Sequence, residues 1–166
     1  ALIEEATILD FPEQYDAIVT IPIKNIVVTS TTHIPSLEML AVDQTLIGFP
    51  NLDYISSKKT RERINKGLIK ELGKNEDINT ESLIELSPDV VIGFAVDGNN
   101  KTFNTLKKTG IPVLYNGDWT ETSPLGKAEW IKFFAAFYNK EALANKLFSE
   151  IKTAYLNAKK LALKAK

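Results

Sequence analysis

The sequence predicts an α/β fold, in which a Rossmann-like parallel sheet is flanked by helices and followed by a long C-terminal helix. Three observations support this prediction. Short runs rich in Val, Ile, Tyr and Phe have the length of strands. These runs are largely apolar, as expected for parallel strands that are buried on both faces. Amphipathic stretches with helical spacing alternate with them, which is the pattern of βα units.

Strands are expected at five places along the chain: Ala17–Thr20, Ile26–Thr29, Leu46–Phe49, Val90–Phe94 and Val113–Tyr115. The opening segment Ala6–Ile21 contains two weaker runs of β-forming residues. We expect this segment to form a hairpin or to add to the edge of the sheet.

Helices are expected between the strands at Pro35–Val42, Lys59–Lys66, Thr80–Leu86 and Asn100–Thr109. The residues at the ends of these four segments are of the types that commonly begin or end a helix. Thr31 or Thr32 could cap the first helix and Asn79 the third. Gly67 and Gly110 follow the second and the fourth, where glycine commonly ends a helix.

After these units the pattern becomes helical. One helix rich in aromatic residues is expected over Pro124–Tyr138, and Asn139 is expected to cap a second helix, from Lys140 to about Lys164. Roughly 25 residues at about 1.5 Å each would make this helix close to 40 Å long. Such a length exceeds what one compact domain needs, so we expect that another part of the protein once followed it.

The composition excludes several classes of function. The 166 residues suit one domain, with 44% hydrophobic and 25% charged residues. Lys and Arg number 20 against 21 Asp and Glu, so the basic excess of a nucleic-acid-binding protein is missing. Cysteine is absent, which excludes disulfides, thiolate zinc sites and iron–sulfur ligation, and the single histidine, His33, cannot build a His-rich metal site.

Sequence motifs of enzymes are also missing. The chain contains no G-x-G-x-x-G, no G-x-x-x-x-G-K-[ST] and no G-x-S-x-G. Its serines and its single histidine show no triad pattern. We therefore expect no catalytic residue, no metal site and no resident cofactor.

Candidate ligand-binding residues follow the predicted strands, because ligands of open parallel sheets bind at the carboxyl ends of the strands. They are Thr31, Thr32, His33, Asn51, Tyr54, Phe94, Asn116, Asp118 and Trp119. A polar rim with aromatic residues suits a medium-sized organic ligand. Simpler roles remain open, because Thr31, Thr32 and His33 could merely lie at the start of a helix. Asp97, which stands beside Gly98, is interpreted as a turn residue.

The charge of this rim bears on the ligand. The four strand-end loops contain no Arg or Lys, although Lys58 and Lys59 could reach from a neighbouring loop. Anionic chelates usually need such residues. The rim therefore fits a neutral or a large planar ligand better, unless another part of the protein supplies the basic groups.

Four segments together resemble one known family. They are NIVVTSTTHIPSLEMLAVDQTLIGF at Asn25–Phe49, DINTESLIELSPDVVIGF at Asp77–Phe94, LKKTGIPVLY, and ETSPLGKAEW at Glu121–Trp130. In this order they resemble periplasmic substrate-binding proteins of the iron–siderophore, haem and vitamin B12 uptake class. The resemblance extends from about Ile26 to the C-terminus.

The resemblance implies two α/β lobes joined by a rigid interlobe helix, with the ligand clamped between the lobes and delivered to an ABC permease without chemistry. Residues 1–138 would be the N-terminal lobe and residues 139–166 the linking helix, with the second lobe absent from this chain. The implied ligand is a small-molecule metal chelate or a tetrapyrrole. Glu81 matches the acid that docks on the permease, although a glutamate in the first turn of a helix is also favoured by the helix dipole.

The resemblance also implies a location and leaves alternatives. Such proteins are exported to the periplasm or cell envelope and associate with the membrane through the permease or through a lipid anchor, which would lie upstream of Ala1. One alternative is a lobe of a nitrogenase-like two-lobed enzyme, which the lack of cysteine disfavours. Another is a stand-alone α/β interaction domain that dimerises through Lys140–Lys164.

Overall fold

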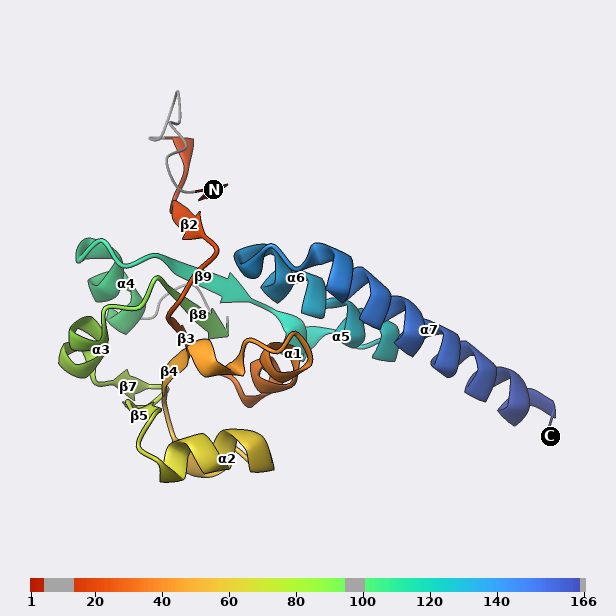
Figure 1. Ribbon diagram of the computed structural model, residues 1–166. Coiled ribbons are helices and arrows are strands. Elements are labelled where there is room, and N and C mark those ends of the chain that lie inside the picture. The colour runs from red at the N-terminus through yellow and green to blue at the C-terminus, as the bar shows by residue number, and fades with distance from the viewer. Residues whose placement is uncertain (5–13, 95–100, 165–166) are drawn as a thin grey trace.

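A five-stranded parallel sheet forms the centre of the protein, whose computed structural model describes residues 1–4, 14–94 and 101–164. Its strand order is β5-β4-β3-β8-β9 (Figure 1). Helices flank the sheet and the long helix α7 ends the chain, which confirms the predicted fold class. The strands are β3 (Ile26–Val28), β4 (Leu46–Phe49), β5 (Lys70–Glu71), β8 (Val90–Phe94) and β9 (Val113–Asn116).

Four of these strands follow the sequence prediction closely. β4 and β8 have the predicted bounds, whereas β3 ends one residue early and β9 extends to Asn116. β5 was not predicted, because it consists of two exposed charged residues, Lys70 and Glu71, that carry no apolar pattern. The edge position of β5 beside β4 explains why such residues are tolerated there.

The two central strands are buried on both faces, and each face has its own core. Ile26 and Val28 of β3 belong to one apolar cluster, whereas Val27 between them belongs to the other. The first cluster includes Leu37 and Phe134 from helices α1 and α6; the second includes residues of α3 and α4. Alternation along a strand therefore sends successive side chains into separate cores.

The helices between the strands are α1 (Ile34–Met39), α2 (Lys58–Asn65), α3 (Thr80–Leu86) and α4 (Lys101–Lys108). Asn79 caps α3 as predicted, since its side chain accepts a hydrogen bond from the Ser82 N–H at 2.9 Å. Gly67 and Gly110 adopt φ of 69° and 85°, as expected of residues that end helices. Asn100, the expected start of the last helix, and Asp97 lie outside the described residues.

The predicted capping of the first helix is wrong. Ser30, and not Thr31 or Thr32, caps a 3-10 turn over Thr31–His33, and α1 continues directly from that turn. α1 ends at Met39, before the predicted Val42, because Ala41 adopts a φ of 52°. The Val42 N–H then bonds to the Leu37 carbonyl in the pattern of a Schellman motif.

The expected single helix over Pro124–Tyr138 is also wrong. The structure contains α5 (Pro124–Glu129), α6 (Ile131–Ala135) and a 3-10 turn over Ala136–Tyr138. With these breaks in the helix, the side chains of Phe134, Phe137 and Tyr138 are all buried in the core. Asn139, expected to cap the next helix, has a φ of 53° and is the residue that ends the 3-10 turn.

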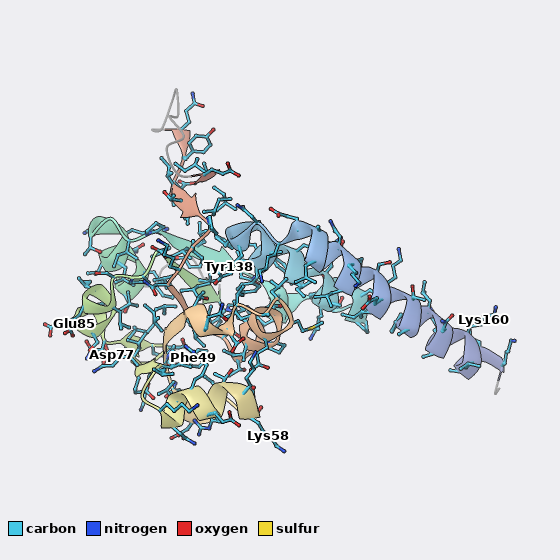
Figure 2. All side chains as sticks on the ribbon, in the orientation of Figure 1. Phe49, Lys58, Asp77, Glu85, Tyr138 and Lys160 are labelled. Carbon is cyan, nitrogen blue, oxygen red and sulfur yellow. The ribbon has the colours of Figure 1, made fainter. Side chains whose placement is uncertain are left out.

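Helix α7 (Glu141–Lys164) begins one residue later than predicted and leaves the body of the domain (Figure 1). Among its described residues only Ala144 is fully buried, and every residue from Lys152 to Lys164 is exposed. Figure 2 shows Lys160 far along this projecting part, whereas Phe49 and Tyr138 lie within the domain. Its 24 residues make it about 36 Å long.

The described residues of the N-terminal segment add no strand to the main sheet. β1 (Leu2–Glu4) and β2 (Val19–Ile21) pair in parallel as a separate two-stranded sheet. The strand predicted from Ala17 to Thr20 therefore corresponds to β2, which starts two residues later, at Val19. Residues 6–13 of the expected Ala6–Ile21 hairpin lie outside the described residues, so the hairpin stays a prediction.

Gly93 is expected to be essential for the packing of α4 on β8. A Cβ at this position would lie 2.6 Å from Cε2 of Phe103, a buried ring that also packs edge-on against Tyr115. Gly93→Ala should therefore lower the free energy of unfolding in urea by about 1–3 kcal/mol. The control is Gly117→Ala, where the nearest atom is 3.7 Å away and φ is −102°. Equal unfolding midpoints of the two variants would contradict the prediction.

Candidate functional site

A hollow of about 220 Å³ lies at the carboxyl ends of the central strands. It is lined by Thr29, Ser30, Thr31, Phe49, Pro50, Tyr54, Asn75 and Phe94. Three of the predicted ligand residues, Thr31, Tyr54 and Phe94, thus lie together. We call this hollow the strand-end pocket.

The loop between β4 and α2 forms one wall of the pocket. Asn51 adopts a φ of 56° and leads into a 3-10 turn over Leu52–Tyr54. The turn leaves Tyr54 with 71% of its surface exposed, although the ring is large and apolar. Asn51, predicted as a ligand residue, is half-buried and is not one of the residues that line the pocket.

The opposite wall comes from a hairpin that the sequence analysis missed. β6 (Gly73–Lys74) and β7 (Asp77–Ile78) pair antiparallel, and Asn75 lies in the turn between them. Strands of two residues carry no hydrophobic period. The polar run Lys74-Asn75-Glu76-Asp77 was the available signal, since such residues favour turns.

One carboxylate joins the two walls. Glu71 accepts hydrogen bonds from the backbone N–H groups of Asn51 and Leu52, each at 3.0 Å, and from that of Gly73 at 2.9 Å. The Asn51 N–H also lies 2.7 Å from the Gly73 carbonyl oxygen. The loop that carries Tyr54 and the hairpin that carries Asn75 are therefore fixed to each other.

Four other predicted ligand residues form one cluster, which consists of the buried His33, Asn116 and Asp118 and the exposed Thr32. His33 is fully buried, and its Nε2 lies 3.6 Å from Oδ1 of Asp118. The Asn116 side chain accepts a hydrogen bond from the Asp118 N–H at 2.8 Å. The Thr32 hydroxyl donates to Asp118 at 2.9 Å. These residues connect the loop after β3 to the loop after β9, so their closest partners are one another.

The environment of Asp118 favours its charged form. Burial acts to raise the pKa of this carboxyl, but contact with His33, the Thr32 hydroxyl and the Trp119 backbone N–H together hold the pKa below its ordinary value. The following residue, Trp119, keeps 45% of its surface exposed. The buried cluster thus supports a loop that presents an aromatic side chain.

Two basic residues of α2, Lys59 and Arg61, contact groups outside the pocket. Lys59, expected to be able to reach the site, contacts Asp43 at 2.6 Å. Arg61 donates to the Leu52 carbonyl at 2.9 Å. Figure 2 shows Lys58 at the end of α2, pointing away from the domain.

A larger hollow of about 290 Å³ lies between α5 and α6 and is lined by Glu121, Gly126, Glu129, Trp130 and Phe133. Its carboxylates have local partners: Glu121 accepts from the Ser123 N–H at 2.9 Å, and Glu129 pairs with Lys132 at 2.6 Å. Glu121 belongs to the loop after β9, and the carboxylates of this hollow already serve the start of α5 and the surface of α6.

Glu81 lies in the first turn of α3 and is exposed. Within the described ranges, no group of three or more His, Asp or Glu side chains is placed to hold a metal ion. No helix in the part of the chain that the structure describes is long and apolar enough to span a membrane.

Residues 26–166 match the family model described as periplasmic binding protein. An uncharacterized lipoprotein of Methanocaldococcus jannaschii is 29% identical over 140 residues, which are 81% of this chain and 34% of that protein. The chain thus spans about a third of the length of this curated relative.

Three solved structures are similar in fold. The petrobactin-binding protein YclQ from Bacillus subtilis has a TM-score of 0.65 at 18% identity and covers 86% of this chain. The periplasmic haem-binding protein HutB (TM-score 0.62, 18% identity) and the vitamin B12-binding protein BtuF (0.60, 14%), both of Vibrio cholerae, cover 78% and 82%. The chain spans 48%, 47% and 49% of these three structures.

The buried cluster leads to a prediction about acid stability. Because the pKa of Asp118 is lowered in the folded state, its stabilising effect is complete above the unfolded-state pKa of about 3.9 and is lost as the pH falls through the folded-state value. Asp118→Asn should cost about 1–3 kcal/mol at pH 7, and the loss should shrink towards pH 2.5. Urea unfolding between pH 7 and 2.5 measures both.

The matched control is Glu62→Gln, which removes an exposed carboxylate of α2. It should follow the wild-type curve at every pH. A penalty for Asp118→Asn that stays constant from pH 7 to pH 2.5 would show that the charge of Asp118 does not stabilise the fold.

Proposed function

Because the chain belongs to the periplasmic binding protein family, we propose that it is part of the solute-binding component of an ABC importer. It holds a metal chelate or a tetrapyrrole at the strand-end pocket and delivers it to a permease without transforming it. The observation that carries this proposal is the pocket itself. Aromatic, hydroxyl and amide side chains converge there from loops fixed by Glu71, and no nucleophile–base pair lies among the lining residues.

The proposed ligand classes come from the similar structures. Their names describe proteins that bind petrobactin, haem and vitamin B12. At this level of identity the likeness concerns the fold, so the ligand of this chain is argued from its own residues. Tyr54 and Phe94 offer aromatic surface, and no basic side chain lines the pocket among the described residues. These features favour a neutral or large planar ligand.

The proposed roles of the site residues differ. Thr31, Tyr54 and Phe94 contact the ligand directly, and Asn51 and Trp119 lie on the rim. Thr32, His33, Asn116 and Asp118 hold the loops that carry those contacts, and a direct ligand role remains for them only if the loops open.

The proposed architecture is that of one lobe with its connecting helix. Residues 1–138 form the N-terminal lobe and residues 139–166 the linking helix, and a second lobe of the complete protein closes over the pocket. The exposed Tyr155, Leu156, Leu161 and Leu163 of α7 are the surface that this lobe covers. The same residues would serve a stand-alone domain that dimerises through α7, and gel filtration distinguishes the two: a tight dimer of the complete protein favours the latter.

The proposed location is the periplasm or cell envelope. The family supports export, and the name lipoprotein belongs to a curated relative. Association with the membrane would run through the permease or through a lipid anchor.

Tyr54 is expected to contribute to ligand binding by stacking. In the complete protein, Tyr54→Ala should weaken binding of the ligand by about 3- to 10-fold, a loss of about 0.5–1.5 kcal/mol. Titration calorimetry with cyanocobalamin, haemin and ferrichrome identifies the ligand and measures the change. Tyr15→Ala, which removes a 47% exposed tyrosine outside the pocket, serves as the control. Equal affinities of the two variants would show that Tyr54 does not contribute to binding. If none of the three probes binds, the proposed function is wrong.

Glu81 is expected to dock on the permease. Glu81→Ala should lower the affinity of the complete protein for its permease in lipid vesicles by about tenfold, which is about 1.4 kcal/mol. The free energy of unfolding should change by no more than about 0.3–1 kcal/mol, the size of a helix-dipole interaction. Glu85→Ala, at the other end of α3, is the matched control (Figure 2). An unchanged transport rate in Glu81→Ala would rule out the docking role.

A further inference from the structure

The direction of Tyr54 in the strand-end pocket is determined by the backbone that carries it. With 71% of its surface exposed, the ring has little packing of its own. It belongs to the 3-10 turn over Leu52–Tyr54, which follows Asn51 with its φ of 56°. A left-handed conformation is uncommon for a residue other than glycine and persists where surrounding contacts impose it. The contacts that hold this turn therefore decide where the aromatic wall stands.

Two charged side chains hold the turn at one residue, Leu52. The Leu52 N–H donates to the Glu71 carboxylate at 3.0 Å, and the Arg61 guanidinium donates to the Leu52 carbonyl at 2.9 Å. The same carbonyl accepts from the Ile55 N–H at 3.1 Å, which closes the turn. Hydrogen bonds to charged groups are stronger than those between neutral groups. Both polar backbone groups of Leu52 are thus fixed, one from β5 and one from α2.

Glu71 also holds the residue that leads into the turn. Its Oε1 atom accepts from the Asn51 N–H at 3.0 Å and from the Gly73 N–H at 2.9 Å, while its Oε2 atom accepts from Leu52. Three backbone donors therefore share both oxygens of one carboxylate. A glutamine has a single acceptor oxygen and cannot reproduce this arrangement.

We propose that Glu71 and Arg61 are positioning residues that set ligand affinity through Tyr54. Neither is one of the residues that line the strand-end pocket, so their effect on a ligand passes through the turn that they hold. This inference rests on the proposed function and adds two residues to the determinants of binding. A ring that is already oriented loses little freedom when a ligand stacks on it, which is how these contacts raise affinity.

Hydrogen exchange of the complete protein without ligand tests whether Glu71 holds the turn. Glu71→Gln keeps the length of the side chain but loses one acceptor oxygen, so the amides of Asn51, Leu52 and Gly73 should exchange several-fold faster. Glu62→Gln, which changes an exposed carboxylate of α2, is the matched control and should leave these amides unchanged. Unchanged exchange in a folded Glu71→Gln variant would overturn the inference.

Titration calorimetry then tests whether the effect passes through Tyr54. The probe is whichever of cyanocobalamin, haemin and ferrichrome binds the complete protein most tightly. Glu71→Gln should weaken its binding by about threefold, and Arg61→Met, which removes the donor to the Leu52 carbonyl, should do the same. In the Tyr54→Ala background neither change should weaken binding further, because the ring that they position is gone.

Thermal melting checks that each variant folds, and Arg61→Met carries the binding test if Glu71→Gln does not fold. Equal losses of affinity with and without Tyr54 would show that the two residues act on the whole fold or on the ligand directly, and the inference would be wrong. Wild-type affinity of a folded Glu71→Gln or Arg61→Met variant would also overturn it and leave the proposed function standing. If none of the probes binds the wild-type protein, both are wrong.

Discussion

Double burial of the central strands is the constraint on which the rest of the structure depends. β3 and β8 have no solvent-exposed face, so Ile26, Val28, Val90 and Ile92 pack against one set of helices while Val27 and Val91 pack against the other. Such strands leave no room for functional side chains along their length. Polar and exposed aromatic groups are therefore confined to the loops beyond the strand ends, which is where the pocket lies.

The same constraint explains what could be predicted from the sequence. Apolar runs such as Leu46–Phe49 and Val90–Phe94 identify the strands, because burial on both faces demands them. The break between α5 and α6 at Trp130 cannot be recognised in the sequence, because one aromatic-rich helix and two short helices have similar composition. The edge strand Lys70–Glu71 is held by backbone pairing with Gly48 and Phe49 and not by its side chains. The parts of the fold that backbone hydrogen bonds determine were thus the ones missed.

The site follows a similar division. The rule that ligands bind beyond the strand ends selected Thr31, Tyr54 and Phe94, which all line the strand-end pocket because parallel strand ends share one edge of the sheet. That reasoning could not separate the pocket from the buried layer beneath it, because the depth of His33 and Asp118 depends on how α6 packs against the loops; the ring of Phe134 lies 5.2 Å from that of His33. It also missed Asn75, which follows none of the predicted strands.

The hairpin closed by Glu71 has a consequence for how such a protein diversifies over evolution. Its base is tied by the hydrogen bond from the Asn79 N–H to the Leu72 carbonyl, and Leu72 and Ile78 on either side are anchored in the core. The turn residues between them, Asn75 among them, carry no part of that anchoring. Substitutions at these positions change the wall of the strand-end pocket and leave the anchoring residues in place. Evolution can therefore vary this wall by altering a few codons in one turn, without rebuilding the scaffold that carries it.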